Sequence, residues 1–588
     1  MKFIKKLFIS TITTIISFII IVFVIVGLAA ISFSDSGSEI SEIQNNSILK
    51  INLNSSITDR GSSNDIDISN IINQSQQNLG LNEILSSIEK AKNDDRIKGI
   101  YLNIENPNAS IATIEEIRNK LQEFKDSTDK FIVSYSEIYS QSAYLISSVA
   151  HQIYMHPEGI LELKGLAYQG MFFKNALEKL DVEAQIIRHG KFKSAVEPFM
   201  LDKMSESNRV QTRGFLTSIW EDIKDEITED RPLDVQEVNL IAENFLIQKA
   251  NDAVKYKLID KLMYKDELID SLKSKLNITD SQDLNVVSLG NYKNAKLEGK
   301  KYSKNKIAVI YATGEISGGE GDNQSIGSEG LSKAIRKARK DDKIKAIVLR
   351  VNSPGGSALA SETILREMAL AKKEKTTVVS MGDVAASGGY YIACQADTIV
   401  ANPTTITGSI GVFGVLFNAQ NMMNNTLGIN VDTVKTNSFA DLGTPFRPLT
   451  TVERNIIQNS VENIYDTFIS RVADGRNMTK NQVDEIGQGR VWSGRDALEL
   501  GLVDVLGGLE KSIELAAEMA KLNDYRIVNL PKEKDPFQEI LDEVMNGQIR
   551  NSILKKELGQ FYPQFKEIQE LRKMDDIQMR MPVHYQIK

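Results

Sequence analysis

The chain carries one sequence pattern twice. Residues 94–102 (DDRIKGIYL) match residues 341–349 (DDKIKAIVL), and further matches follow both segments in the same order, such as residues 156–157 with residues 402–403. A repeat that runs along most of a chain predicts two tandem domains of one fold. The length of 588 residues agrees with this prediction, because a single hydrophobic core rarely serves so long a chain.

Each copy alternates short β-branched segments with amphipathic ones. In the second copy we expect strands at residues 306–311, 346–351, 376–381 and 398–401, and helices at residues 330–340, 361–373 and 390–396. Such alternation predicts an α/β fold built from parallel βαβ units. Ligands of such sheets bind beyond the carboxyl ends of the strands, which is where a site is expected.

The repeats divide the chain into five predicted parts. They are a cytoplasmic and membrane-anchoring segment (residues 1–33), a stalk (34–46), the first repeat (47–304), the second repeat (305–525) and a polar helical tail (526–588), with a helix expected over residues 537–561. The tail has no counterpart within the repeats, and its sequence predicts no role.

The first residues have the pattern of a membrane anchor. Lys2, Lys5 and Lys6 precede the uncharged, largely apolar residues 7–33. At about 1.5 Å per residue, a helix of this length exceeds the hydrocarbon core of a bilayer, which is about 30 Å thick. A cleavable signal peptide is the alternative, because residues 27–30 are small, but its apolar region spans only about 7–15 residues. An uncleaved inner-membrane anchor is therefore favoured. The lysines predict a cytoplasmic N-terminus with both repeats outside, which is the periplasm in a bacterium with two membranes.

A strand-to-helix turn in the second copy presents a serine. The β-branched residues 376–381 run into small residues, and Ser387 and Gly388 stand at the tip, before the apolar residues 390–392. A serine in this place exposes its hydroxyl, and the Gly388 amide at a helix N-terminus favours a developing negative charge. The stretch predicts a nucleophile with one oxyanion donor. A structural turn with a capping serine is the alternative for this stretch taken alone.

The two copies differ where chemistry is expected. Gln141 aligns with Ser387, so the first copy lacks the serine, and Lys193 aligns with about Ala440, so the second copy lacks the lysine. A serine needs a base to become a nucleophile, and the second repeat contains no histidine. We therefore predict one site shared between the copies, with Lys193 as general base. This role requires burial that lowers the lysine pKa from about 10.4 toward 7–8.

Two neighbours of Lys193 are rivals for the role of base. Lys191 lies two residues away and shares the face of Lys193 on an extended segment, so spacing alone does not separate them. His189 is the other candidate.

Further small-residue turns supply the remaining parts of the predicted site. Gly356 follows a buried strand and is predicted to be the second oxyanion donor, although a structural Gly-Gly turn is the alternative. Ser409 is predicted to orient the lysine amine, and its counterpart in the first copy is Leu163. Asp383 is interpreted as a turn-capping carboxylate and Cys394 as a small core residue.

Composition excludes several other classes of site. A net charge of −8 gives no indication of a nucleic-acid partner, and the single cysteine excludes an internal disulfide. The four histidines are scattered, so we predict no metal site and no cofactor.

Four ordered segments together resemble a known family. Residues 190–199 (GKFKSAVEPF), 352–357 (NSPGGS), 381–393 (MGDVAASGGYYIA) and 402–414 (NPTTITGSIGVFG) are similar to the signal peptide peptidase A (protease IV) family, in its long form with two repeats. The resemblance implies tandem crotonase/Clp-protease-like domains and a membrane-anchored serine protease. It implies homotetramers at the periplasmic face that degrade signal peptides already cleaved from their precursors.

The motif matches also imply roles for individual residues. They make Ser387 the nucleophile and Lys193 the general base of a Ser/Lys dyad, with Ser409 as the serine that orients the lysine. Two other functions are compatible with the residues alone. A crotonase-like acyl-CoA enzyme would share the glycine turns, and a non-catalytic membrane scaffold would need no nucleophile.

Overall fold

The computed structural model describes residues 43–61, 79–279, 281–295, 303–322, 325–532 and 578–581. The predicted anchor over residues 7–33 and the predicted helix over residues 537–561 lie outside this part of the chain. Within it, none of the helices combines the length and the apolar character that crossing a bilayer requires.

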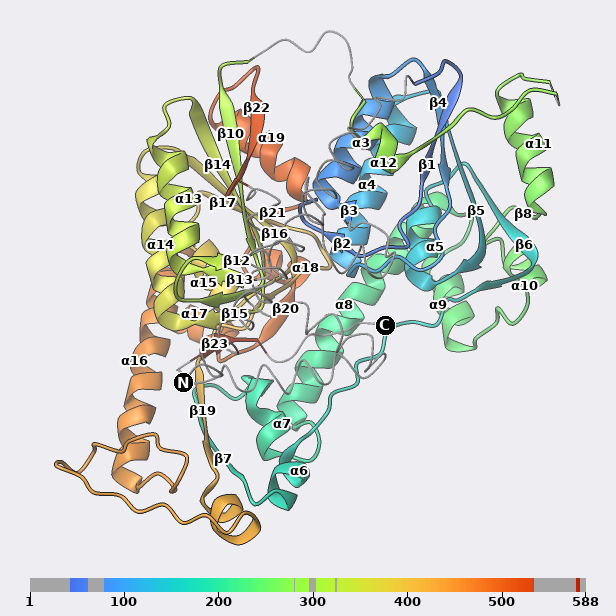
Figure 1. Cartoon of the computed structure of the whole chain (residues 1–588). Helices are drawn as coiled ribbons and strands as arrows, with labels where there is room; N and C mark the ends of the chain where they lie inside the picture. Colours follow the sequence, from blue (N-terminus) through green and yellow to red (C-terminus); the bar gives the residue numbers. More distant parts are fainter. Residues whose placement is uncertain are drawn as a thin grey trace, which may run out of the picture.

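The first repeat forms a six-stranded parallel sheet (Figure 1). The strand order is β8 (Lys261–Leu262), β6 (Gln152–Leu161), β5 (Phe131–Tyr139), β4 (Ile97–Leu102), β1 (Ser47–Ile51) and β9 (Val286–Ser288). Alternate residues of a strand face opposite sides of a sheet, and helices cover both faces of this one, so apolar side chains are buried on both. Thus Ile100 and Leu102 of β4 join one apolar cluster and Tyr101 joins another.

Helices of the first repeat pack on both faces of its sheet. One face is covered by α3 (Leu81–Asn93), α4 (Ile111–Ser127), α5 (Gln141–Ser147), α8 (Glu206–Asp230), α9 (Val235–Glu243), α10 (Ala250–Lys255) and α12 (Leu289–Tyr292), and the other by α11 (Lys265–Lys275). A short parallel pair, β2 (Ile57–Thr58) and β3 (Leu79–Gly80), lies at the edge of this repeat.

The second repeat has the same plan. Its eight-stranded sheet runs β20 (Val491–Ser493), β18 (Ile406–Gly408), β16 (Thr376–Ala386), β14 (Ile344–Ser353), β10 (Lys306–Thr313) and β22 (Arg526–Leu530). In addition, β17 (Thr398–Ala401) pairs with β16, and β21 (Val505–Leu506) pairs with β17. All four strands predicted for this copy are present. Strand β16 runs past residue 381 to Ala386, so it ends directly before Ser387.

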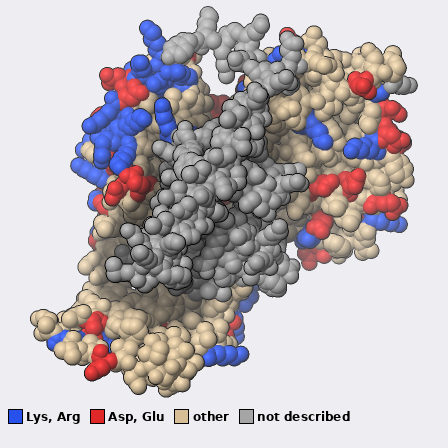
Figure 2. Space-filling view, in the orientation of Figure 1, with Lys and Arg blue, Asp and Glu red and all other residues tan. Residues whose placement is uncertain are grey.

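Helices cover the second sheet as they cover the first. They are α13 (Ser328–Lys340), α14 (Ala358–Lys372), α15 (Gly388–Ala393), α16 (Thr451–Arg476), α17 (Lys480–Ile486) and α18 (Gly494–Glu499) on one side, and α19 (Leu509–Met519) on the other. The three helices predicted for this copy are present, and α15 begins earlier than expected, at Gly388. Lys and Arg side chains gather over α13, where Figure 2 shows a basic surface.

A third, seven-stranded sheet joins the two repeats. Its order is β12 (Gly321–Asp322), β13 (Ser325–Gly327), β11 (Glu315–Ser317), β15 (Gly355–Ser357), β23 (Gln578–Arg580), β19 (Phe413–Asn418) and β7 (Glu183–Arg188). Strand β7 belongs to the first repeat by sequence, yet it pairs antiparallel with β19 of the second along its whole length. After β7 come η1 (Ser194–Val196) and α7 (Glu197–Met200). The pairing of β7 with β19 therefore holds the segment around Lys193 against the second repeat (Figure 1).

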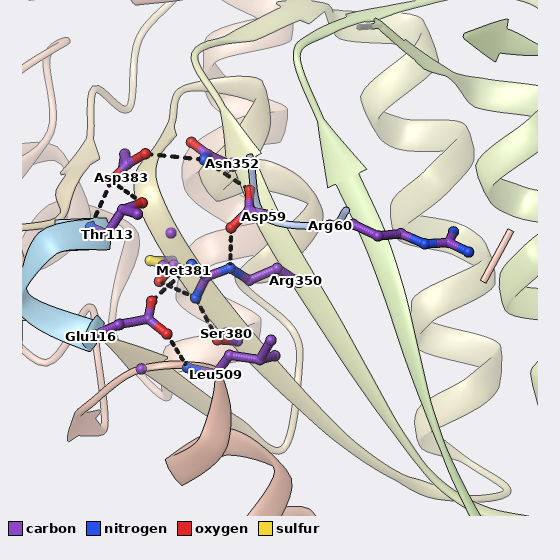
Figure 3. A network of polar contacts seen from close by, with 12 residues as sticks. Asp59, Arg60, Thr113, Glu116, Arg350, Asn352, Ser380, Met381, Asp383 and Leu509 are labelled. Carbon is purple, nitrogen blue, oxygen red and sulfur yellow. Dashed lines mark hydrogen bonds and ion pairs between the residues drawn. The ribbon is translucent and has the colours of Figure 1, made fainter. Parts of the chain in front are cut away.

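Ion pairs fix the interface between the two repeats. Arg350 of β14 is fully buried, and its guanidinium contacts Asp59 at 2.7 Å and Glu116 at 2.8 Å, both from the first repeat (Figure 3). A buried cation needs such partners, because removal from water is costly for an unpaired charge. The two carboxylates raise the pKa of Arg350 against the opposing effect of burial.

Asp383 supports the same interface as a helix cap. Its carboxylate accepts hydrogen bonds from the backbone nitrogen and the hydroxyl of Thr113, both at 2.9 Å, in the first turn of α4. Asn352 donates to the same carboxylate at 3.3 Å. The structure thus supports the capping interpretation, with the difference that the capped helix belongs to the other repeat.

The described part of residues 526–588 forms strands. Strand β22 pairs with β10 and completes the second sheet, so the repeat extends beyond the predicted boundary at residue 525. The remaining strand, β23, lies in the third sheet between β15 and β19.

Candidate active site

Ser387 stands at the junction of β16 and α15 in a conformation that non-glycine residues rarely adopt. Its φ of 56° and ψ of −114° turn the chain sharply between Ala386 and Gly388. The backbone nitrogen of Ser387 donates to the Gly408 carbonyl at 2.8 Å, which ties the turn to β18. Backbone strain of this kind is typical of functional turns. The side chain of Ser387 is fully buried.

Lys193 reaches this turn within the same chain. Its Nζ atom is hydrogen-bonded with Ser387 Oγ at 2.8 Å, and both side chains are 0% exposed. The amine also donates to the carbonyl oxygen and to the hydroxyl oxygen of Ser409, each at 3.1 Å. The structure therefore brings together three of the five predicted site residues through direct contacts.

The surroundings of Lys193 favour a neutral amine. Burial lowers its pKa well below the usual 10.5, and no acidic side chain in the described part of the structure offsets this effect. A neutral amine has two hydrogens and one lone pair. With the two hydrogens directed at the oxygens of Ser409, the lone pair faces the hydroxyl of Ser387, which is the arrangement that a base requires.

Gln211 of α8 and Gly489 hold the segment around Lys193 in place. The side-chain amide of Gln211 donates to the Phe192 carbonyl at 3.1 Å and to the Ser194 hydroxyl at 2.9 Å, on either side of Lys193. Gly489 has a φ of 83°, and a Cβ built there would lie 2.6 Å from the backbone nitrogen of Lys193. Neither Gln211 nor Gly489 was expected from the sequence, because nothing in their local patterns indicates this contact.

The two rivals of Lys193 lie elsewhere. Lys191 is exposed and its Nζ atom lies 5.1 Å from the ring centroid of Phe192. His189 is bound to Glu462 at 2.6 Å and stacks on Tyr465 with ring centroids 3.7 Å apart. Neither side chain is among those that hydrogen-bond Ser387 in the described residues.

The two predicted oxyanion donors lie side by side. A Cβ built on Gly388 would come within 3.1 Å of the Gly356 nitrogen, so the two backbones approach each other closely. Gly356 has a φ of 155°, and a Cβ there would lie 2.0 Å from the Ile316 carbonyl oxygen. Side chains are thus excluded at this position, and the arrangement can present both amides to one carbonyl oxygen.

The first repeat has a serine at the equivalent turn, which corrects the predicted alignment with Gln141. Strand β5 ends at Tyr139 and α5 begins at Gln141, so Ser140 takes the place of Ser387. Its φ is −62°, and its hydroxyl accepts from the Ala143 nitrogen at 3.2 Å as an ordinary N-cap. The copies therefore differ in backbone conformation as well as in side chains.

Cys394 has the environment predicted for it. The thiol is fully buried and donates to the Tyr391 carbonyl at 3.2 Å. Burial raises its pKa to about 12, which keeps it protonated.

Comparison with known proteins agrees with this geometry. The model of peptidase family S49 matches residues 123–279 and 369–523, one segment in each repeat. The model of the Clp protease family matches residues 306–405, which include Gly356 and Ser387. Both matches confirm the α/β fold with repeated Clp-protease-like domains.

Relatives of similar length carry protease names. The chain is 37% identical to Protease 4 of Salmonella typhi, in an alignment that covers 81% of this chain and 77% of that protein. It is 32% identical to Protease 4 of Haemophilus influenzae, with coverages of 84% and 83%. It is 34% identical to the chloroplastic serine protease SPPA of Arabidopsis thaliana, with coverages of 80% and 70%.

Proposed function

The chain belongs to peptidase family S49 and is a serine protease, and we propose that Ser387 is its nucleophile and Lys193 its general base. The observation that carries this proposal is the 2.8 Å contact between Lys193 Nζ and Ser387 Oγ inside a fully buried site. Ser409 is the orienting residue, and Gly356 and Gly388 are the oxyanion donors.

The proposed reaction is acyl transfer through an ester. Neutral Lys193 takes the proton of the Ser387 hydroxyl while Ser387 Oγ bonds to the peptide carbonyl carbon. The amides of Gly356 and Gly388 stabilise the oxyanion, and the lysine gives its proton to the departing amine as the peptide bond breaks. Lys193 then takes a proton from water as the water oxygen attacks the ester carbonyl carbon, and it returns this proton to Ser387 Oγ as the ester bond breaks, which regenerates the neutral amine.

The proposed substrates are extended apolar peptides, among them signal peptides already cleaved from their precursors. The sheet geometry supports an extended conformation, because Gly356 lies in β15, and the extended segment β23 pairs with β15 at this glycine. The apolar residues 7–33 support a location at the inner membrane, with both repeats on the periplasmic side. Signal peptides are apolar and remain in the membrane, which matches this location.

We further propose that the chain works as a homotetramer. The segment between β19 and α16 projects from the body of the molecule (Figure 1) and exposes a group of large apolar side chains. They are Leu427, Ile429, Val431, Val434, Phe439 and Leu442. A patch of this kind is typical of surfaces that a partner covers, and the occupant proposed here is another copy of the chain. Val434→Asp should dissociate the assembly, as measured by light scattering of the purified protein.

Peptide hydrolysis tests the proposed dyad. Ser387→Ala and Lys193→Ala should each abolish cleavage of a fluorogenic apolar peptide while circular dichroism stays unchanged. Lys191→Ala is the matched control, because Lys191 is exposed two residues away, and it should retain full activity. Turnover by either alanine variant would contradict the dyad.

A further inference from the structure

Strand β23 occupies the place between two strands that border the candidate active site. It pairs antiparallel with β15, which carries Gly356, and with β19, through Phe413 and Gln578. Residues 578–581 are at most 9% exposed. An extended segment inserted between two sheet edges is how peptides bind by strand addition.

The register places one carbonyl of this strand at the oxyanion donors. Gly356 pairs with Met579 and Gly355 with Arg580, and the Met581 nitrogen donates to the Pro354 carbonyl at 2.7 Å. Hydrogen-bonded pairs alternate along an antiparallel ladder, which makes Gly356 and Met579 the next hydrogen-bonded pair. The Met579 carbonyl oxygen and the Gly388 nitrogen also lie 2.1 Å and 2.7 Å from the point where a Cβ of Gly355 would stand.

The side chains of β23 fit their surroundings on both sides. Met579 joins the apolar cluster of the second repeat, and Met581 joins that of the first. Arg580, between them, faces the opposite way and forms an ion pair with Glu315 of β11 at 3.2 Å. The groove between β15 and β19 thus holds an apolar, a cationic and an apolar residue in sequence.

We propose that residues 578–581 are an intramolecular occupant of the peptide groove, bound in the register of a substrate and in competition with peptides. This inference rests on the proposed function, because it uses the same oxyanion donors. Only one strand fits between β15 and β19, so a peptide reaches Ser387 only when β23 leaves. The same register predicts that peptides are cut after an apolar residue that precedes a cation able to pair with Glu315.

Substitutions in the full-length chain test the competition. Met579→Asp with Met581→Asp places two charges in apolar clusters and should release the strand. If the strand is bound about nine-tenths of the time, its release raises kcat/KM for a fluorogenic peptide about tenfold. Met519→Asp is the matched control, because it makes the same change at a half-exposed methionine away from the groove, and it should leave kcat/KM unchanged.

A charge exchange provides a second variant in case the double aspartate protein folds poorly. Arg580→Glu should also raise kcat/KM, because it places like charges at the ion pair with Glu315. Adding Glu315→Arg should restore the wild-type value for a peptide that carries no charged residue at the position facing Glu315, since the ion pair with the strand is rebuilt with its charges exchanged. Equal kcat/KM in the wild-type, Arg580→Glu and double aspartate proteins would overturn the proposal.

A binding measurement separates this inference from the proposed catalytic function. In the Ser387→Ala background, a fluorescent peptide with the sequence of residues 574–586 should bind about tenfold more tightly once the strand is released. Tighter binding without hydrolysis in any serine-containing variant would retain the inference and reject the dyad. Hydrolysis with unchanged peptide binding would reject the inference and retain the dyad.

Discussion

Lys193 Nζ lies 2.8 Å from Ser387 Oγ, although the two residues stand 194 positions apart in the sequence. Each comes from a different repeat, and the antiparallel pairing of β7 with β19 brings them together within one chain. The dyad therefore exists only where the two repeats pack against each other, since neither repeat contains both groups.

Replacing the buried lysine should stabilise the protein. Burial lowers the pKa of Lys193 in the folded state, so folding favours loss of its proton below pH 10.5, and the free-energy cost grows as the pH falls from 10.5 toward the lowered pKa. Lys193→Met removes the cost. We expect the free energy of unfolding in urea to rise at pH 7, with a smaller gain near pH 10. Lys191→Met should show neither effect, and a less stable Lys193→Met protein at pH 7 would contradict a neutral amine.

The activity should follow the protonation of the same amine. Only neutral Lys193 acts as a base, so kcat/KM should rise with pH and level off well below pH 10.5. Ser409→Ala removes one hydrogen bond that orients the amine, and kcat should fall about 10²-fold with little change in KM. A profile that climbs without a plateau to pH 10.5 is incompatible with the lowered pKa.

The backbone at Gly356 should tolerate no side chain. Gly356→Ala forces a Cβ to within 2.0 Å of the Ile316 carbonyl and displaces an oxyanion donor, so kcat should fall about 10²- to 10³-fold. Gly318→Ala is the control, because nothing lies within 4 Å of a Cβ built there. Near-normal kcat in Gly356→Ala would remove Gly356 from the oxyanion site.

The interface between the repeats should depend on Arg350. Arg350→Met leaves Asp59 and Glu116 buried without their cation, and the expected loss is about 3–5 kcal/mol in the free energy of unfolding. Adding Asp59→Asn and Glu116→Gln should recover most of this loss, because the buried charges are then gone. Urea unfolding of the three proteins measures both steps. A single substitution without effect would mean that water reaches the two carboxylates.

Glu226 should make stability depend on pH in the opposite direction from an ordinary carboxylate. Burial raises its pKa from 4.5 to about 7, so the folded protein holds this proton more tightly than the unfolded chain. Stability contributed by the proton is present below pH 4.5 and is lost as the pH rises through 7. Glu226→Gln should therefore stabilise the protein at pH 8 and change little at pH 5. Glu229→Gln, at a side chain that is 67% exposed, should show no such difference.

Much of the fold and the site follows from the repeat. The matched segments gave both sheets, and the strands of the second copy were predicted closely because their β-branched character is strong. Ser387 was identified by its small neighbours, and Lys193 by its presence in one copy only. The first inference uses local sequence, whereas the second needs a comparison of the two copies and the family resemblance, because spacing alone does not separate Lys193 from Lys191. Both residues lie in the candidate site.

Other features depend on contacts between distant residues. The sequence alignment paired Ser387 with Gln141 instead of Ser140. The reason is that β16 is longer than β5, and the ends of both strands are known only from the structure. Arg350 lies within an apolar strand pattern, and its partners come from the other repeat. Strand β23 was predicted as part of a helical tail, although its alternation of methionines and arginine is typical of a strand with two different faces.

Peptide hydrolysis by co-assembled variants tests the central claim most directly. The wild-type protein, Ser387→Ala, Lys193→Met and a co-expressed mixture of the two variants would be compared at equal concentration with one fluorogenic peptide. Because serine and lysine meet within one chain, only the wild-type protein should cleave the peptide, and the mixture should remain inactive. Activity in either variant would refute the dyad, and activity in the mixture would show that the two groups meet between chains instead.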